Sequence, residues 1–141
     1  MNKDLENIDV HNLANTIIFS VDQMGEYITN MDLQRILYFM KVSHYKKNGT
    51  MLFNNPLQAW DYGPVVDIIW KKYSKYGREP INKDEEITEY DRALFQDVSN
   101  FVATYLEIPK WEINNMINGI SSPYTKARNS KDIHISEVHM N

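Results

Sequence analysis

The chain has 141 residues, the usual size of one domain, and a chain of this length can bury most of its apolar surface in one core. Because 43% of the residues are hydrophobic and 24% are charged, the composition is that of a globular protein and excludes an intrinsically disordered chain. The lack of cysteine excludes disulfides, thiolate metal sites and a cysteine nucleophile, and the net charge of −4 disfavours nucleic acid as a partner.

The beginning of the chain carries no recognisable targeting signal. Residues 1–9 are polar and acidic, without the basic start and apolar run of a signal peptide. No later stretch is apolar over the length that a bilayer requires. We therefore expect a cytoplasmic protein with no membrane insertion, folded as one domain over residues 1–141.

Two amphipathic helices are predicted in the first third of the chain. The first follows Asp9, a suitable N-cap, and the second begins with the capping-box spacing of Thr29 and Asp32 after a loop at residues 24–26. The first helix has an apolar face made of Val10, Leu13, Ala14, Ile17, Ile18 and Val21. The second has an inner stripe of Leu33, Ile36, Leu37 and Met40, widened by Tyr38, Phe39 and Val42. So broad an apolar arc predicts a central helix that is buried on two sides.

A short two-stranded β element is predicted after the turn at Asn48 and Gly49. Residues 51–53 and 57–60 have extended character and are separated by a turn at 54–56. Gly63 and Pro64 then indicate the start of a third helix, with the proline in its first turn. The apolar stripe of this helix is Val65, Val66, Ile69, Trp70 and Tyr73, and Gly77 is expected to end it.

The second half of the chain is predicted to hold a loop, three helices and a tail. Residues 78–89 are polar and acidic and indicate a loop, near whose end Thr88 and Asp91 repeat the capping-box spacing. The fourth helix has the apolar residues Leu94, Val98, Phe101, Val102 and Tyr105. Pro109 begins a fifth helix, with Trp111, Ile113, Met116 and Ile117 in its stripe. Ser122 and Pro123 cap and open a short sixth helix.

Residues 129–141 are expected to form a polar tail that packs at most through Ile133, Ile135 and Val138. The predicted fold class is therefore mainly α. It is a compact single domain of five to six helices, with a short two-stranded β element between helices two and three.

The motif from Trp60 to Val65 has two interpretations. In the structural one, Gly63 supplies a backbone conformation closed to other residues, Pro64 presets a helix start and Trp60 fills the core beneath the turn. In the functional one, Trp60 and Tyr62 form a binding loop, since tryptophan and tyrosine dominate interface hot spots. The structural interpretation is favoured for Trp60, and both remain open for Tyr62, whose hydroxyl can stay in water while its ring packs.

Tyrosines exceed what a core of this size needs, because each buried hydroxyl requires a hydrogen-bond partner. Some of them should therefore lie at the surface. The candidates for contact with a partner are Tyr62, Trp70, Tyr73, Tyr38 and Tyr76.

No pattern indicates catalysis, a metal site or a cofactor. The histidines His11, His44, His134 and His139 are scattered, and the carboxylates of Asp61 and Asp67 have no companion nucleophile or base. The acidic group at residues 84–86, with Glu89, is interpreted as a solvated loop, and docking of a basic partner surface is the alternative. We therefore predict a protein that is not an enzyme.

At residues 33–39, and again at 53–66, the sequence resembles the Panacea antitoxin domain. The family pattern is a leucine-leucine-tyrosine-phenylalanine run, which residues 36–39 match with isoleucine in first place, and a short leucine-phenylalanine segment. Alanine-tryptophan and tyrosine-glycine-proline-valine follow, and residues 73–77 continue the match. The likeness covers residues 8–126. It departs at 118–124, where relatives have threonine-histidine before proline-tryptophan and this chain has proline-tyrosine.

The resemblance implies a toxin–antitoxin system, in which the antitoxin binds its partner toxin directly, neutralises it and catalyses nothing. At least one relative delivers its toxin to a protease as an adaptor. One alternative is a phage accessory protein that binds a host or defence protein. Another is a nucleic-acid-binding regulator, which the acidic balance and the lack of a separate helix-turn-helix region disfavour. Homo-oligomerisation stays open.

Overall fold

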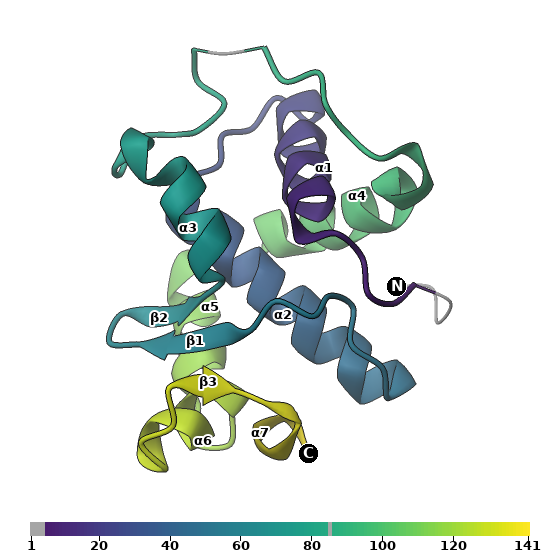
Figure 1. Ribbon diagram of the computed structural model, residues 1–141. Helices are drawn as coiled ribbons and strands as arrows, with labels where there is room; N and C mark the ends of the chain where they lie inside the picture. The colour runs from purple at the N-terminus through teal and green to yellow at the C-terminus, as the bar shows by residue number, and fades with distance from the viewer. Residues whose placement is uncertain (1–4, 85) are drawn as a thin grey trace.

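The computed structural model describes residues 5–84 and 86–141, which fold into seven α-helices, one 3-10 helix and three short strands (Figure 1). This confirms the prediction of a mainly helical fold. The elements are α1 (Val10–Gln23), α2 (Asn30–Asn48), β1 (Leu57–Trp60), β2 (Gly63–Val65), α3 (Asp67–Tyr73), η1 (Ser74–Tyr76), α4 (Arg92–Glu107), α5 (Lys110–Asn118), α6 (Pro123–Asn129), β3 (His134–Ile135) and α7 (Glu137–Met140).

Helix α2 crosses the middle of the molecule, with α1 and α4 on one side and the small sheet on the other (Figure 1). Its predicted stripe is fully buried, and the burial of Tyr38 and Val42 confirms that it is covered on two sides. The predicted capping box is present, because the Thr29 hydroxyl accepts from the Asp32 N–H at 3.2 Å and the Asp32 carboxylate faces the Thr29 N–H. The start of α2 is therefore fixed by its own sequence.

Helix α1 packs along α4. Asp9 caps α1 as predicted, accepting from the His11 N–H at 2.8 Å, and all six apolar residues predicted for its inner face are buried. The N-cap of α4 differs from the prediction. Asp91 itself accepts from the Ala93 N–H at 2.9 Å, while Thr88 is exposed in the preceding loop. The capping-box spacing was therefore misleading at this position.

The hairpin lies one segment later than predicted. Strand β1 pairs antiparallel with β2, and Pro64 faces Ala59, so the Gly63-Pro64 pair belongs to a strand and α3 begins only at Asp67. Gly63 has a φ of 142°, a value that side chains with a Cβ rarely tolerate, directly after the two-residue turn. A proline is accepted in β2 because this strand is at an edge of the sheet, where a missing N–H breaks no further pairing.

Residues 51–53, which were expected to pair with 57–60, instead pair with the beginning of the chain. The Asn7 and Ile8 N–H groups donate to the carbonyls of Met51 and Leu52 at 3.0 and 2.8 Å. The two-stranded element predicted between α2 and α3 is therefore present, but residues 57–60 pair with 63–65, and residues 51–53 form no strand.

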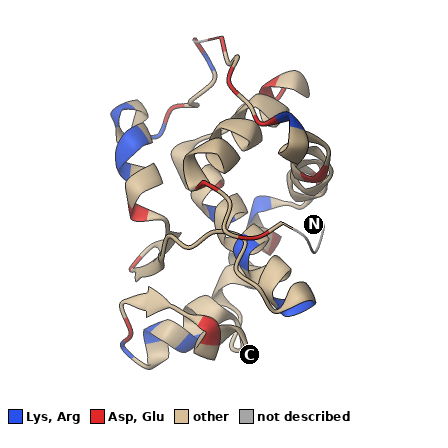
Figure 2. Ribbon diagram, turned by 45° about the vertical axis from the view of Figure 1, so that its right-hand side comes forward, with Lys and Arg blue, Asp and Glu red and all other residues tan. Residues whose placement is uncertain are grey.

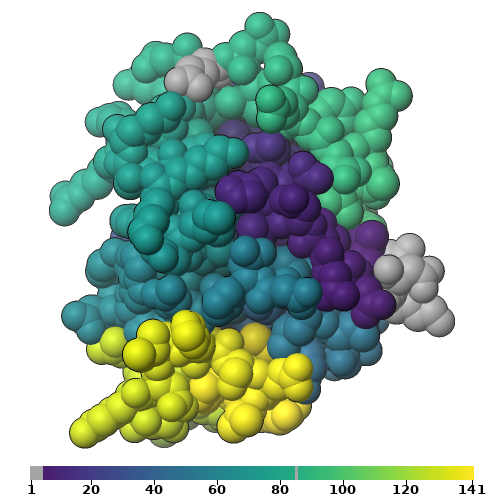
Figure 3. All heavy atoms as spheres, in the orientation of Figure 1, coloured from purple at the N-terminus to yellow at the C-terminus, as the bar shows by residue number. Residues whose placement is uncertain are grey.

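The segment expected to be a polar tail contributes to the fold. Strand β3 pairs with the free side of β1, with Ile135 opposite Leu57, which makes the sheet three-stranded in the order β2-β1-β3. Ile135 is buried as expected, but Ile133 and Val138 are exposed, and His139 and Met140 in α7 are buried instead. Figure 3 shows these C-terminal residues, in yellow, packed against the middle of the chain.

The polar loop at residues 78–89 is anchored mainly at Ile81, which is buried and donates its N–H to the Ile28 carbonyl at 2.7 Å, and at Asn82. Asn82 is buried, its Oδ1 accepts from the Ile28 N–H at 3.0 Å, and its Nδ2 donates to the Glu26 carbonyl at 2.8 Å. Of the predicted acidic group, Asp84, Glu86 and Glu89 are exposed, and Glu85 lies outside the described residues. This loop is thus more constrained than its composition indicated.

Helices α5 and α6 follow α4 in the chain and pack against each other. In α5, Ile113 and Ile117 are buried, whereas Trp111 and Met116, expected in the same stripe, are exposed. Ser122 caps α6 as predicted, accepting from the Thr125 N–H at 3.1 Å. In the described residues no helix combines the length and apolarity needed to cross a membrane.

Candidate partner-binding surface

Three aromatic side chains from the hairpin and from α3 meet at the surface. Trp60 comes from β1, Tyr62 from the hairpin turn and Trp70 from α3, and their ring centroids are 5.8 to 6.1 Å apart in edge-on or tilted arrangements. Tyr62 is 53% exposed and both tryptophans are half-buried. We call these residues the aromatic cluster. Trp60 is therefore not the core residue that the structural interpretation predicted.

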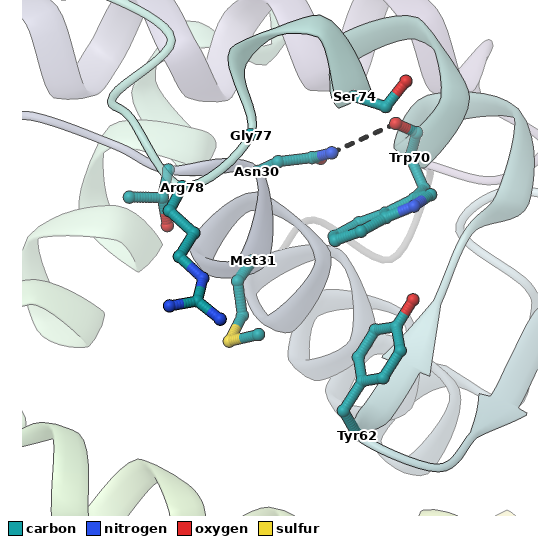
Figure 4. Close-up of a pocket in the computed structure, with 8 residues that line it drawn as sticks. Asn30, Met31, Tyr62, Trp70, Ser74, Gly77 and Arg78 are labelled. Carbon is teal, nitrogen blue, oxygen red and sulfur yellow. Dashed lines mark hydrogen bonds between the residues drawn. The ribbon is translucent and has the colours of Figure 1, made fainter.

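A groove of about 730 Å³ borders the aromatic cluster. It runs between the start of α2, the hairpin turn and the end of η1. Its lining residues are Thr29, Asn30, Met31, Tyr62, Trp70, Ser74, Gly77 and Arg78. Figure 4 shows the rings of Tyr62 and Trp70 on one side, Met31 between, and the Arg78 guanidinium on the opposite side. The walls are mainly apolar, and the charge at the rim is positive.

Two amides in α2 hold the groove in shape. Asn30 donates from Nδ2 to the Trp70 carbonyl at 3.0 Å, which ties α3 to the start of α2 (Figure 4). Gln34 donates to Asn30 Oδ1 at 3.0 Å and accepts from the Val66 N–H at 2.8 Å. Both side chains are almost fully buried, so these bonds are shielded from water. Their signal in the sequence is a pair of amide side chains four residues apart, and therefore on one face, near the start of α2.

Helix α6 supports the hairpin from the other side. The Tyr124 hydroxyl donates to the carbonyl of Trp60 and lies 3.3 Å from that of Asp61. Arg128 donates to the Ala59 carbonyl at 3.1 Å and to the Asp61 carboxylate at 2.7 Å. Burial of the Tyr124 hydroxyl raises its pKa, so it stays a donor. Tyr124, the aromatic residue after Pro123, therefore has a structural role in holding the hairpin.

The structure does not bring the other predicted tyrosines to the groove. Tyr38 is 1% exposed and its hydroxyl accepts from the Tyr124 N–H, so it belongs to the core and is unavailable to a partner. Tyr73 is also buried, donates to Asn15 Oδ1 at 3.3 Å, and has its pKa raised to about 12 by burial. Tyr76 is half-buried beside Tyr73 and lines a different, more polar hollow.

Of the histidines and carboxylates singled out in the sequence, His134 is exposed and His11 half-buried, whereas His44, His139, Asp61 and Asp67 have hydrogen-bond or ion-pair partners. His44 is buried between Thr50 Oγ1 and Asn48 Nδ2, and burial lowers its pKa. His139 is buried 2.8 Å from an Asp132 oxygen. Asp61 and Asp67 pair with Arg128 and Lys71, respectively. Across residues 5–84 and 86–141, no three histidine or carboxylate side chains gather as a metal would require.

Comparison with known proteins finds a family match over a stretch that includes the hairpin and Trp70. The sequence pattern of the family described as "Antitoxin SocA-like, Panacea domain" matches residues 33–137, from α2 to the start of α7. The chain is similar to a protein named Antitoxin SocA from Caulobacter vibrioides (strain NA1000 / CB15N), with 27% identity over 77 residues. These residues are 55% of this chain and 41% of that relative, so the chain spans about two fifths of its length. No solved structure matches the chain significantly. Because the family pattern covers well over half of its residues, the chain belongs to the Antitoxin SocA-like, Panacea domain family.

Proposed function

We propose that the chain is an antitoxin that neutralises a partner toxin by direct protein–protein binding, without catalysis, and that the groove with its aromatic cluster is the contact surface. The observation that carries this proposal is the apolar surface that Tyr62 and Trp70 of the aromatic cluster form with Met31. Tyr62 and Met31 are exposed, 53% and 40%, beside half-buried Trp70, in a concave and mainly apolar site. Exposed aromatic and methionine side chains in such a hollow are typical of interface hot spots.

The rigidity of the site supports the same function. The hairpin is held by Tyr124 and Arg128 from α6, and α3 is held by Asn30 from α2. A surface that is already ordered loses little conformational entropy when a partner binds, so more of the contact energy becomes affinity. The same contact would serve an antitoxin that covers the toxin and an adaptor that presents the toxin to a protease.

The test is co-expression with the product of the neighbouring open reading frame, scoring growth and co-purification. We expect the wild-type chain to restore growth and to co-purify with that product. The variant Tyr62→Ala should weaken binding by about tenfold or more, because it removes an exposed hot-spot ring and leaves the core intact. Trp70→Ala should do the same, with the melting temperature measured alongside because Trp70 is half-buried.

A matched control is Trp111→Ala, which removes a 66% exposed tryptophan on α5, outside the groove. This variant should rescue growth like the wild type. Full rescue by Tyr62→Ala and Trp70→Ala would exclude the groove as the contact surface. Failure of the wild-type chain to co-purify with the toxin would contradict the function itself.

A further inference from the structure

We infer that the occupant of the groove is a segment of the partner protein in which an apolar anchor side chain lies next to a carboxylate, with the carboxylate at Arg78. This inference rests on the proposed function, because it specifies the chemistry of the partner segment that fills the same groove. It follows from two separate properties of the site, its apolar walls and the sign of its charge.

The apolar walls continue beyond the main groove. A smaller hollow, lined by Arg35 and by the residues of β2, shares Met31, Tyr62 and Trp70 with the groove. The two hollows therefore form one continuous surface with three shared side chains. A methionine beside two aromatic rings adapts to the shape of an inserted side chain, and the rings supply a large contact area. The matching partner residue is aliphatic or aromatic.

The charge along this surface is positive, although the whole chain carries −4. Arg78 lines the groove and Arg35 lines the smaller hollow, and no carboxylate lines either one in the part of the chain that the structure describes. Within that part, neither arginine has a carboxylate at ion-pair distance. Arg35 donates to the neutral amide of Asn114 at 2.7 Å.

Two acidic residues on the segments around the groove already have basic partners, and the exposed Asp84 and Glu86 do not line the groove. Asp67 pairs with Lys71 at 3.0 Å and Glu79 with Lys83 at 3.9 Å. The exposed Arg78 guanidinium is thus the group that an incoming carboxylate would meet, and arginine binds carboxylates through two parallel hydrogen bonds. Next to an apolar wall such a pair gives specificity, because a partner segment with a basic residue at this place would be repelled.

The experiment is selection of random peptides displayed on phage against the immobilised full chain, followed by titration of the enriched peptides in solution. We expect the enriched sequences to share an apolar or aromatic residue with Asp or Glu beside it. Their affinity should fall by about tenfold with Arg78→Glu and with Tyr62→Ala. Arg92→Glu, the same charge change at an exposed residue of α4 outside the groove, should leave the affinity within about twofold.

Replacing the peptide's Asp by Asn should abolish the sensitivity to Arg78→Glu, since the pair would already be broken. Enriched peptides without acidic residues, equal binding to Arg78→Glu, or no enrichment would each overturn the inference. These results are separable from the proposed function. If the toxin still co-purifies in a Tyr62-dependent way, only the partner chemistry is wrong, whereas a toxin that never co-purifies contradicts the function whatever the peptides show.

Discussion

Lys41 lies in the interior of α2, where burial disfavours its charged form. The side chain is 4% exposed, its ammonium donates to the Asn55 carbonyl at 2.7 Å, and it lies 4.7 Å from the centre of the Phe53 ring. These contacts replace only part of the lost hydration, and burial lowers the pKa of Lys41 to about 8. The residue ties α2 to the loop before β1 at the cost of a partly desolvated charge.

This lowered pKa makes stability depend on pH in a defined direction. Lysine in the unfolded chain keeps its ordinary pKa of 10.5, so between pH 8 and 10.5 the unfolded chain binds more protons than the folded one. The free energy of unfolding therefore rises with pH in this window. Relative to Lys41→Met, the wild type should gain about 1–2 kcal/mol from neutral pH to about pH 9.5, measured by urea unfolding of both proteins.

Lys46→Met, at an exposed position of the same helix, is the control. The difference in unfolding free energy between the wild type and this variant should not change over the same pH range. A difference between wild type and Lys41→Met that stays constant with pH would mean that the Lys41 ammonium is hydrated in the folded protein.

At the scale of elements, the helices were predictable because their signals are local. Asp9, the pair Thr29 and Asp32, and Ser122 each cap a helix within three residues of themselves, so sequence spacing alone identifies them. Thr88 carried the same spacing without capping a helix. A local pattern thus identifies a candidate, and the packing around it decides whether it is used.

The sheet was misassigned because the residue types in these segments do not determine which segments pair. Gly63 and Pro64 fit a helix start as well as they fit an edge strand, and only the pairing of β2 with β1 decides between them. Strand β3 has two residues and no period of its own, so nothing in the sequence distinguishes it from a tail.

The candidate site was predictable in part. Tyr62 and Trp70 were chosen from composition and motif, and both line the groove. Arg78 and Met31 were missed because they come from separate elements, and no sequence spacing relates them to the hairpin. Tyr38 was chosen wrongly, since a tyrosine can be buried when a backbone group supplies its hydrogen bond.

The hairpin depends on α6, and Tyr124→Phe tests this dependence. The change removes the hydroxyl that binds the carbonyl of Trp60 and keeps the buried ring, so the core should stay packed. We expect a loss of about 1 kcal/mol and faster hydrogen exchange of the amides at residues 61–63, measured by mass spectrometry or NMR.

The matched change Tyr45→Phe removes a hydroxyl that binds Asn141 Oδ1 at 3.2 Å, at the other end of α2. It should leave exchange at residues 61–63 unchanged. Equal exchange in Tyr124→Phe and the wild type would show that the turn needs no support from α6.

For the whole molecule, the distribution of charge bears on its partners. Basic residues lie on several separate elements with acidic residues between them (Figure 2). The most basic stretch, in α3 and η1, is partly neutralised because Lys71 pairs with Asp67, while Lys72 and Lys75 lie over the rings of Tyr73 and Tyr76. Among the described residues the basic side chains are thus spread over separate elements, which disfavours a partner that presents a phosphate backbone.

We therefore expect no retardation of duplex DNA by the chain in a gel-shift assay at low ionic strength, where electrostatic binding is strongest. A shift that disappears as salt is added would contradict this expectation and would favour a regulator of transcription.

The pairing of β3 with β1 has a consequence for the synthesis of the protein. The middle strand of the sheet leaves the ribosome early, but its second neighbour follows only after α3, α4, α5 and α6 have been made. Until then β1 has one edge open and the hairpin lacks the support of α6. A nascent chain therefore completes the surroundings of the aromatic cluster only after α6 and β3 have been translated.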